Sequence, residues 1–190
     1  MRSILGISLE KNILRFYAGT LLYNLMFFMP IWVIFLQQKH GLTLTQVTLV
    51  DFAFWMTMAL TEVPTGAVAD TIGRKTSMVI GYLLSIAATL LFGLAPTYPL
   101  LLLANSLWGI ALTFLSGADM AFFYDTLQAL GRQEEYKRRR GHLQALSVIG
   151  MGLGNGLGGL LAARNMTSPF VLYAGMILTR GRDFFVHTSI

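Results

Sequence analysis

Polar and aromatic side chains stand at helical spacing inside the long apolar stretches of this sequence. In the second stretch a carboxylate and an indole share one helix face, and in the fourth stretch an amide and an indole do so. Aromatic walls with few polar groups suit an amphiphilic organic substrate. A purely structural role is the alternative for each residue. The residues that we predict to line a substrate cavity are Asn24, Asp51, Trp55, Asn105 and Trp108.

Three further carboxylates lie in the same stretches, nearer to the basic residues Arg74 and Lys75. They are Glu62, Asp119 and Asp125. Charged groups within apolar helices pair with one another or face a cavity. We expect this charge cluster to pair with Arg74 or Lys75. Asp51, which we expect within reach of the water outside, then remains as a candidate for binding a coupling proton or cation.

The sequence shows no arrangement that would support catalysis or hold a metal. There is no cysteine, and the three histidines have no ligand spacing. Tyr124-Asp125 matches one half of the aspartyl intramembrane protease signature, but Gly-x-Gly-Asp does not follow it, and the serine nucleophile motif G-x-S-x-G is also absent. We therefore predict that the protein is not an enzyme and that it binds no metal or cofactor.

Composition identifies the elements that must position these residues as membrane helices. Apolar and aromatic residues make up 55% of the 190 residues, while charged residues make up 12%, about half of the ~25% usual in soluble domains. A water-soluble globule could not cover so much apolar surface. The net charge of +5 suits the orientation of membrane helices, and we predict no nucleic-acid partner. The bilayer is the first partner that we expect.

Runs without formal charge predict an all-α membrane protein with six transmembrane helices. A helix needs ~20 apolar residues to cross the hydrocarbon. The longest charge-free run holds two crossings, which Pro96 and Pro99 divide. Beyond the sixth helix, which we expect to be truncated, we predict a polar tail at 180–190. The predicted spans are residues 16–37, 45–69, 76–95, 100–124, 142–163 and 168–179, after a cytoplasmic N-terminus at 1–15.

The positive charges predict the orientation of these spans. If residues 1–15 lie inside the cell, all lysines and arginines except Lys39 and Arg164 fall in inner segments. Lysine and arginine accumulate on the cytoplasmic side of membrane proteins. We therefore predict a multi-pass protein of the cell (plasma or inner) membrane, with both termini in the cytoplasm.

The loop between the second and third predicted helices carries a recognisable motif. It reads Gly66, Ala69, Asp70, Gly73, Arg74 and Lys75 at the spacing of G-x-L-A-D-R-x-G-R-K. Here the sequence resembles the major facilitator superfamily, with Thr71 in place of the usual basic residue. A glycine such as Gly66 permits close approach of another helix, and Gly73 can adopt a left-handed turn conformation.

The fifth predicted helix carries a second motif, rich in glycine. The drug–proton antiporters of the same superfamily show G-x8-G-x3-G-P-x2-G-G here, and Asn155 replaces the proline. Glycines at four-residue steps form a ridge that permits close helix packing. The motif residues are Gly141, Gly150, Gly154, Asn155, Gly158 and Gly159.

The resemblance implies the N-terminal six-helix half of a transporter that works by alternating access. Members of the superfamily hold their substrate between two such bundles, so we expect a C-terminal bundle or a second copy as partner. The chain is then a truncated or frameshifted fragment that does not transport alone. We predict efflux of drug-like or amphiphilic compounds. Facilitated or ion-coupled uptake of a small metabolite is one alternative, which Asn105 favours because proton-coupled members carry arginine there. A non-transporting accessory protein is another.

Overall fold

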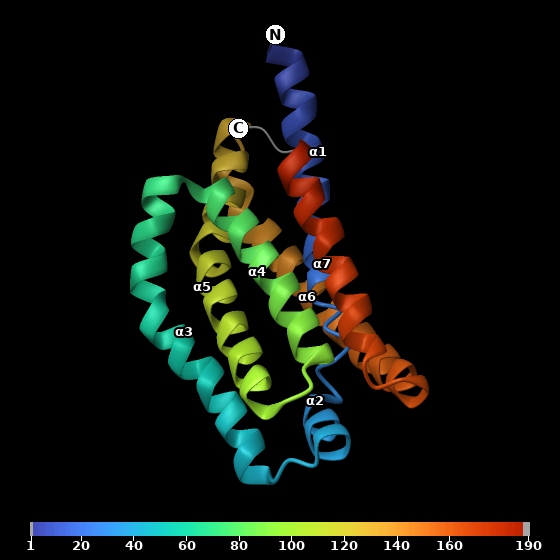
Figure 1. Ribbon diagram of the computed structural model, residues 1–190. Coiled ribbons are helices and arrows are strands. Elements are labelled where there is room, and N and C mark those ends of the chain that lie inside the picture. The colour runs from blue at the N-terminus through green and yellow to red at the C-terminus, as the bar shows by residue number, and fades with distance from the viewer. Residues whose placement is uncertain (1, 188–190) are drawn as a thin grey trace.

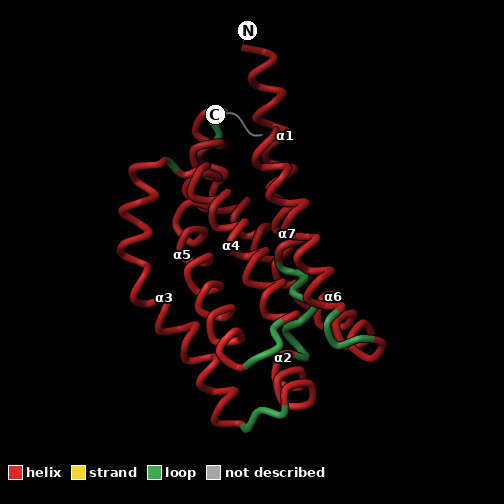
Figure 2. Tube along the Cα trace, viewed as in Figure 1, coloured by secondary structure: helices red, strands yellow, loops and turns green. Residues whose placement is uncertain are grey.

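The computed structural model describes residues 2–187, and the side chains of residues 10–181. Helices make up almost all of this part of the chain, which contains no strand (Figure 2). The elements are α1 (Arg2–Tyr23), α2 (Trp32–Ile34), the π-helix η1 (Phe35–Lys39), α3 (Leu44–Ile72), α4 (Arg74–Leu94), α5 (Tyr98–Ala129), the 3₁₀-helix η2 (Gln133–Glu135), α6 (Tyr136–Arg164) and α7 (Ser168–His187).

The long helices pack side by side as one bundle (Figure 1). The α4 helix lies at its centre, against α5 on one side and α7 on the other, while α3 packs on α5 and α1 contacts both α6 and α7. The turn between α3 and α4 marks one end of the bundle, here called the Arg74 end, and α2 and η1 lie at the opposite end, here called the Lys39 end (Figure 1).

Four helices of the described chain are long and apolar enough to cross a membrane. They are Leu44–Ile72, Arg74–Leu94, Tyr98–Ala129 and the segment Gln133–Arg164. These helices contain almost all of the second to fifth predicted spans. The first and last predicted spans fall in α1 to η1 and in α7, which do not meet this criterion. The count of six crossings therefore stays a prediction.

The first predicted span is not one continuous helix. We expected a helix over residues 16–37, but α1 ends at Tyr23 and residues 24–31 form turns before α2 begins. Pro30 explains this break, because its ring clashes with the carbonyl of the residue four positions earlier and restricts the residue before it. That earlier residue, Met26, has a positive φ of 27°. The non-helical stretch 24–31 faces the candidate site.

The last helix continues beyond the end that we predicted. We placed the end of a truncated sixth span at Thr179 and a polar tail at 180–190, but α7 runs to His187, and residues 188–190 lie outside the described residues. Arg180 suggested a boundary because a charge is unfavourable in hydrocarbon. In the structure this residue is only 3% exposed and its charge is paired, so the helix continues through it.

The Lys39 side chain contacts three segments of the chain at the Lys39 end of the bundle. Its ammonium group donates to the carbonyl of Gly93 at 3.2 Å and to the Thr167 hydroxyl at 2.7 Å. It also lies 4.8 Å from the centre of the Phe35 ring. These contacts hold together the end of α4, the turn before α7 and the π-helix η1, next to the candidate site.

Candidate substrate cavity

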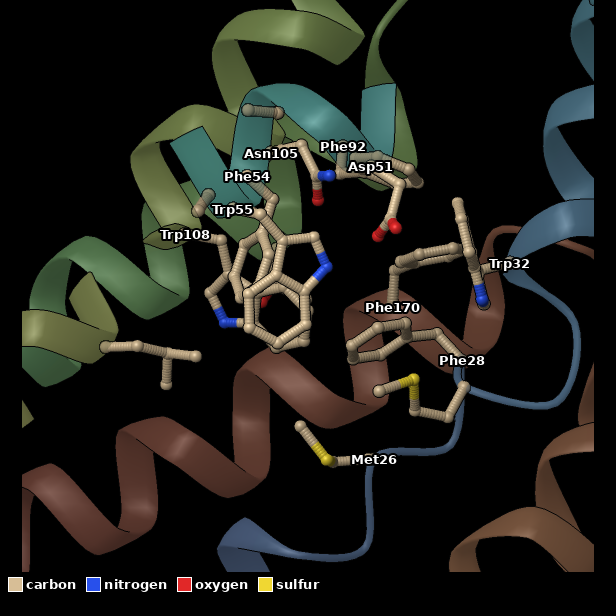
Figure 3. A pocket seen from close by; sticks show the side chains of 15 residues that line it. Met26, Phe28, Trp32, Asp51, Phe54, Trp55, Phe92, Asn105, Trp108 and Phe170 are labelled. Atoms are coloured by element: carbon tan, nitrogen blue, oxygen red, sulfur yellow. The ribbon is translucent and has the colours of Figure 1, made fainter. Parts of the chain in front are cut away.

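A cavity of about 350 Å³ lies among the non-helical stretch 24–31 and helices α2, α3, α4, α5 and α7 (Figure 3). Its described lining contains all three tryptophans of the chain and a single charged residue. The walls are aromatic and aliphatic apart from Asp51, Asn105 and Thr89. The lining residues are Met26, Phe28, Met29, Trp32, Asp51, Phe54, Trp55, Ala88, Thr89, Phe92, Ala104, Asn105, Trp108, Leu112 and Phe170.

Two of the three polar side chains of the cavity lie on the same side. Figure 3 shows Asp51 and Asn105 next to each other on that side, with aromatic rings across from them. The Asn105 side-chain nitrogen donates to the carbonyl of Val50 at 2.7 Å, which fixes the amide and links α5 to α3. Asp51 has no hydrogen-bond or ion-pair partner among the described side chains. Its carboxylate is therefore available to a ligand.

The indole rings of Trp55 and Trp108 form apolar walls of the cavity. Trp108 meets Phe28 edge-on, with ring centres 5.1 Å apart, and packs on Phe54 at 5.8 Å. The Trp108 indole N–H is buried and finds no acceptor within the described structure. Trp55 packs edge-on against Phe54 at 5.0 Å but is 57% exposed, so the cavity is open along α3. A ligand with a flat apolar body and a polar group would meet both kinds of wall.

The structure brings together four of the five predicted cavity residues, namely Asp51, Trp55, Asn105 and Trp108. The fifth, Asn24, is not part of the lining, because its side chain donates to the carbonyl of Thr20 at 2.8 Å at the end of α1. Sequence reasoning missed the contributions of Met26 and Met29 in the stretch 24–31, and those of α2, α4 and α7. The proline at position 30 was the one signal that could have revealed that stretch.

The three carboxylates of the predicted charge cluster do not share partners. Glu62 makes no ion pair with a described residue, so its expected pairing with Arg74 or Lys75 is wrong. Asp125 pairs with Arg74, which joins α5 to the start of α4, as we expected. Asp119 instead accepts two hydrogen bonds from Arg180 at 3.1 and 3.2 Å, so its expected pairing with Arg74 or Lys75 is wrong. Spacing along α5 explains this, because six residues separate the two aspartates, which therefore point to different neighbours.

The loop motif forms the tight turn of the Arg74 end. Gly73 joins α3 directly to α4 with φ 85°, a conformation that L side chains rarely adopt, and its N–H donates to the carbonyl of Ala69 at 3.0 Å. Asp70 lies exposed in the last turn of α3, and Lys75 lies half-buried in the first turn of α4. Gly66 does not make the close helix contact that we expected, since no described atom lies within 4 Å of the place of a β-carbon.

The glycine motif of α6 packs against the last turn of α1 and the stretch 24–31 at three of its six positions. A β-carbon on Gly150, Gly154 or Gly158 would lie 2.8, 1.4 and 2.0 Å from the carbonyl oxygens of residues 21, 25 and 27, respectively. Only glycine permits so close an approach. Gly141 and Gly159 have open space, and Asn155 is exposed. The ridge therefore supports the same non-helical stretch whose other side lines the cavity.

The family model described as Major Facilitator Superfamily matches residues 16–179. The chain belongs to this superfamily. A comparison with curated proteins finds no match. Members of the superfamily are membrane transporters and not enzymes, and the apolar helices agree with a location in the membrane. The matched range contains the whole lining of the cavity.

Proposed function

We propose that the protein exports drug-like, amphiphilic organic molecules across the plasma membrane by alternating access, with both termini in the cytoplasm. The observation that carries this proposal is the cavity of about 350 Å³, whose described walls combine three indole rings with one carboxylate. That volume lies in the range of small-molecule sites. An amphiphile would place its apolar body against Phe28, Phe54 and Trp108 and its polar group beside Asp51.

Uptake of a small hydrophilic metabolite fits the cavity less well. Such a substrate needs many hydrogen-bonding groups in its site, because each buried polar group without a partner costs free energy. The Asn105 amide already donates to Val50, and the Thr89 hydroxyl donates to the carbonyl of Ser85 at 2.7 Å. Few groups then remain for a hydroxyl-rich ligand. The glycine ridge, with its close approach at Gly154, further favours an antiporter-like protein.

Alternating access requires a second body against which this bundle can rock. We propose that a second six-helix bundle supplies it, either as a C-terminal continuation or as a second copy of the chain. The open side of the cavity at Trp55 would then face that bundle. Saturable substrate flux through liposomes that contain only monomeric chain would contradict this requirement.

Binding of tetraphenylphosphonium to the purified chain in lipid nanodiscs tests the function directly. This probe joins aromatic rings to a single positive charge, so we expect saturable binding that other amphiphiles displace and glucose does not. Trp108→Ala should weaken binding at least tenfold because it removes a wall of the cavity. Trp108→Phe, a milder change, should weaken it less. Binding that glucose displaces, or that neither variant changes, would contradict the proposal.

A further inference from the structure

A second cavity of about 280 Å³ adjoins the substrate cavity on the Arg74 side. Leu112 contributes to both linings, so the two cavities are neighbours along α5. The second cavity is lined from α1, α3 and α5, and it holds the carboxylates of Glu62 and Asp119. The two cavities therefore lie end to end along α3 and α5, with Asp51 in the first and Glu62 in the second.

One face of α3 contributes to both cavities. Its two carboxylates are eleven residues apart, which corresponds to about three helical turns and about 16 Å along the axis. The side chains between them are aromatic or aliphatic, and their spacing of three and four residues keeps them on the same face. From the first cavity to the second, this face presents Asp51, Phe54, Trp55, Met58 and Glu62.

The two long walls, α3 and α5, are held at a fixed distance from each other. A β-carbon on Gly109 of α5 would lie 2.7 Å from the carbonyl oxygen of Phe54 on α3, so the two backbones touch there. Further along, the hydroxyls of Thr61 and Thr113 are 3.5 Å apart and share a hydrogen bond. The separation between the two carboxylates of α3 is therefore set by the fold before any ligand binds.

The carboxylates of the two cavities differ in what they already contact. Asp119 accepts two hydrogen bonds from the buried guanidinium of Arg180, at 3.1 and 3.2 Å, so this pair carries no net charge. Asp51 and Glu62 make no hydrogen bond or ion pair through their carboxylates among the described residues. Each end of the paired cavities therefore offers one unpaired negative charge, with apolar walls between the two.

We propose that the two cavities together bind dicationic amphiphiles, in which an apolar spacer joins two cationic groups. This inference rests on the proposed function and names its substrate class. One cationic group would lie beside Asp51 and the other beside Glu62. The spacer would pass along Trp108, Leu112 and Met58, which line the middle of the path.

The fixed separation of the carboxylates makes the length of the spacer decisive. Once one cation has bound, the other binds within the same complex, at an effective concentration that is greatest when the spacer matches the span. A shorter spacer cannot reach, and a longer one loses effective concentration. An extended chain advances about 1.2 Å per bond, so a spacer of twelve methylene groups separates its terminal nitrogens by about 16 Å.

A length series of bis(trimethylammonium) alkanes tests the proposal by calorimetric titration of the purified chain in phosphatidylcholine nanodiscs. We compare spacers of four, twelve and sixteen methylene groups, with empty nanodiscs as the blank. The affinity should be greatest at twelve and at least tenfold above that at four. Affinity that rises steadily through sixteen would overturn the proposal, because it would report only the increasing apolar surface of the ligand.

Substitutions at the two ends then assign the maximum to the carboxylates. Glu62→Gln and Asp51→Asn should each abolish the preference for twelve methylene groups, whereas Glu62→Asp, which keeps a carboxylate, should retain it. Glu134→Gln is the matched control, since Glu134 is exposed and lines neither cavity. A maximum that persists in Glu62→Gln would overturn the assignment. Circular dichroism and size-exclusion chromatography establish that each variant folds.

The unaltered chain separates this inference from the proposed function. Saturable binding of tetraphenylphosphonium without a length maximum among the dications would refute the dication site and leave the proposed function in place. Absence of saturable binding for every cation, tetraphenylphosphonium included, would refute the proposed function itself.

Discussion

Arg180 of α7 donates two hydrogen bonds to Asp119 of α5, across 61 positions of sequence and inside the bundle. The arginine side chain is 3% exposed and that of the aspartate 21%. Because α7 and α5 lie on different sides of α4, the pair connects the two halves of the bundle through its interior.

Asp119→Asn should strongly destabilise the protein. The change leaves the Arg180 guanidinium buried without its counter-ion, for which we expect a loss of about 3–5 kcal/mol in the free energy of unfolding. Asp125→Asn is the matched control, because its partner Arg74 is half exposed and an exposed pair contributes about 1 kcal/mol or less. Denaturant unfolding in detergent micelles compares the two variants. Equal effects would contradict the structural role of the buried pair.

Gly154→Ala should disrupt the contact between α6 and the stretch 24–31. A β-carbon at this position would lie 1.4 Å from the carbonyl oxygen of Leu25, so α6 and the stretch 24–31 must separate. We expect a loss of about 1–3 kcal/mol, as for other overpacked positions. The control is Gly156→Ala, which meets no described atom within 4 Å and should gain about 0.5–1 kcal/mol from better helix propensity. Opposite signs in thermal melting would confirm the orientation of α6.

Asp51→Asn should remove the charge selectivity of the substrate cavity. Tetraphenylphosphonium and tetraphenylborate have the same shape and opposite charge, so their binding ratio reports the field around the only charged side chain in the described lining. We expect the chain to prefer the cation by at least tenfold, about 1.4 kcal/mol, and the variant to lose most of this preference. Glu134→Gln removes one negative charge elsewhere and should leave the ratio unchanged. An unaltered ratio in Asp51→Asn would show that the cavity does not bind the probe.

His40 should make the Lys39 end of the bundle less stable in mild acid. Burial of the ring, and then the neighbouring Lys39, lower the pKa of His40 below its usual 6.5. The unfolded chain therefore takes up the proton more readily, and stability falls as the pH drops through about 6.5 towards the folded pKa. His40→Gln should remove this part of the decline in melting temperature between pH 7.5 and 5.5. The same change at His142 serves as a control, and parallel curves for His40→Gln and the unaltered chain would contradict the prediction.

The sequence was sufficient to predict those features that depend on local periodicity. Charge-free runs identified the segments that became α3 to α6, because a membrane helix satisfies its backbone hydrogen bonds internally. Helical spacing grouped Asp51 with Trp55 and Asn105 with Trp108, and the structure places all four in the lining of one cavity. The signal lies within single helices, so it requires no knowledge of how the helices pack.

Features that depend on contacts between helices were beyond the sequence. Arg180 suggested the end of a span because its partner, Asp119, lies on another helix and no spacing rule connects the two. Phe28 and Met26 reach the cavity because α1 breaks, and periodicity alone predicts a continuous helix there. The contacts of the α6 glycines likewise depend on which carbonyl oxygens lie opposite α6. The sequence predicted that α6 packs closely, but not that its partner is a non-helical stretch.

The stretch 24–31 contacts both the cavity and α6. Its side chains Met26, Phe28 and Met29 form one wall of the substrate cavity, while its backbone at Leu25 carries the glycine ridge of α6. Any substitution that moves α6 outward by a few tenths of an ångström would also move that wall. Variants with altered affinity for tetraphenylphosphonium should therefore arise in α6, at positions outside the lining of the cavity.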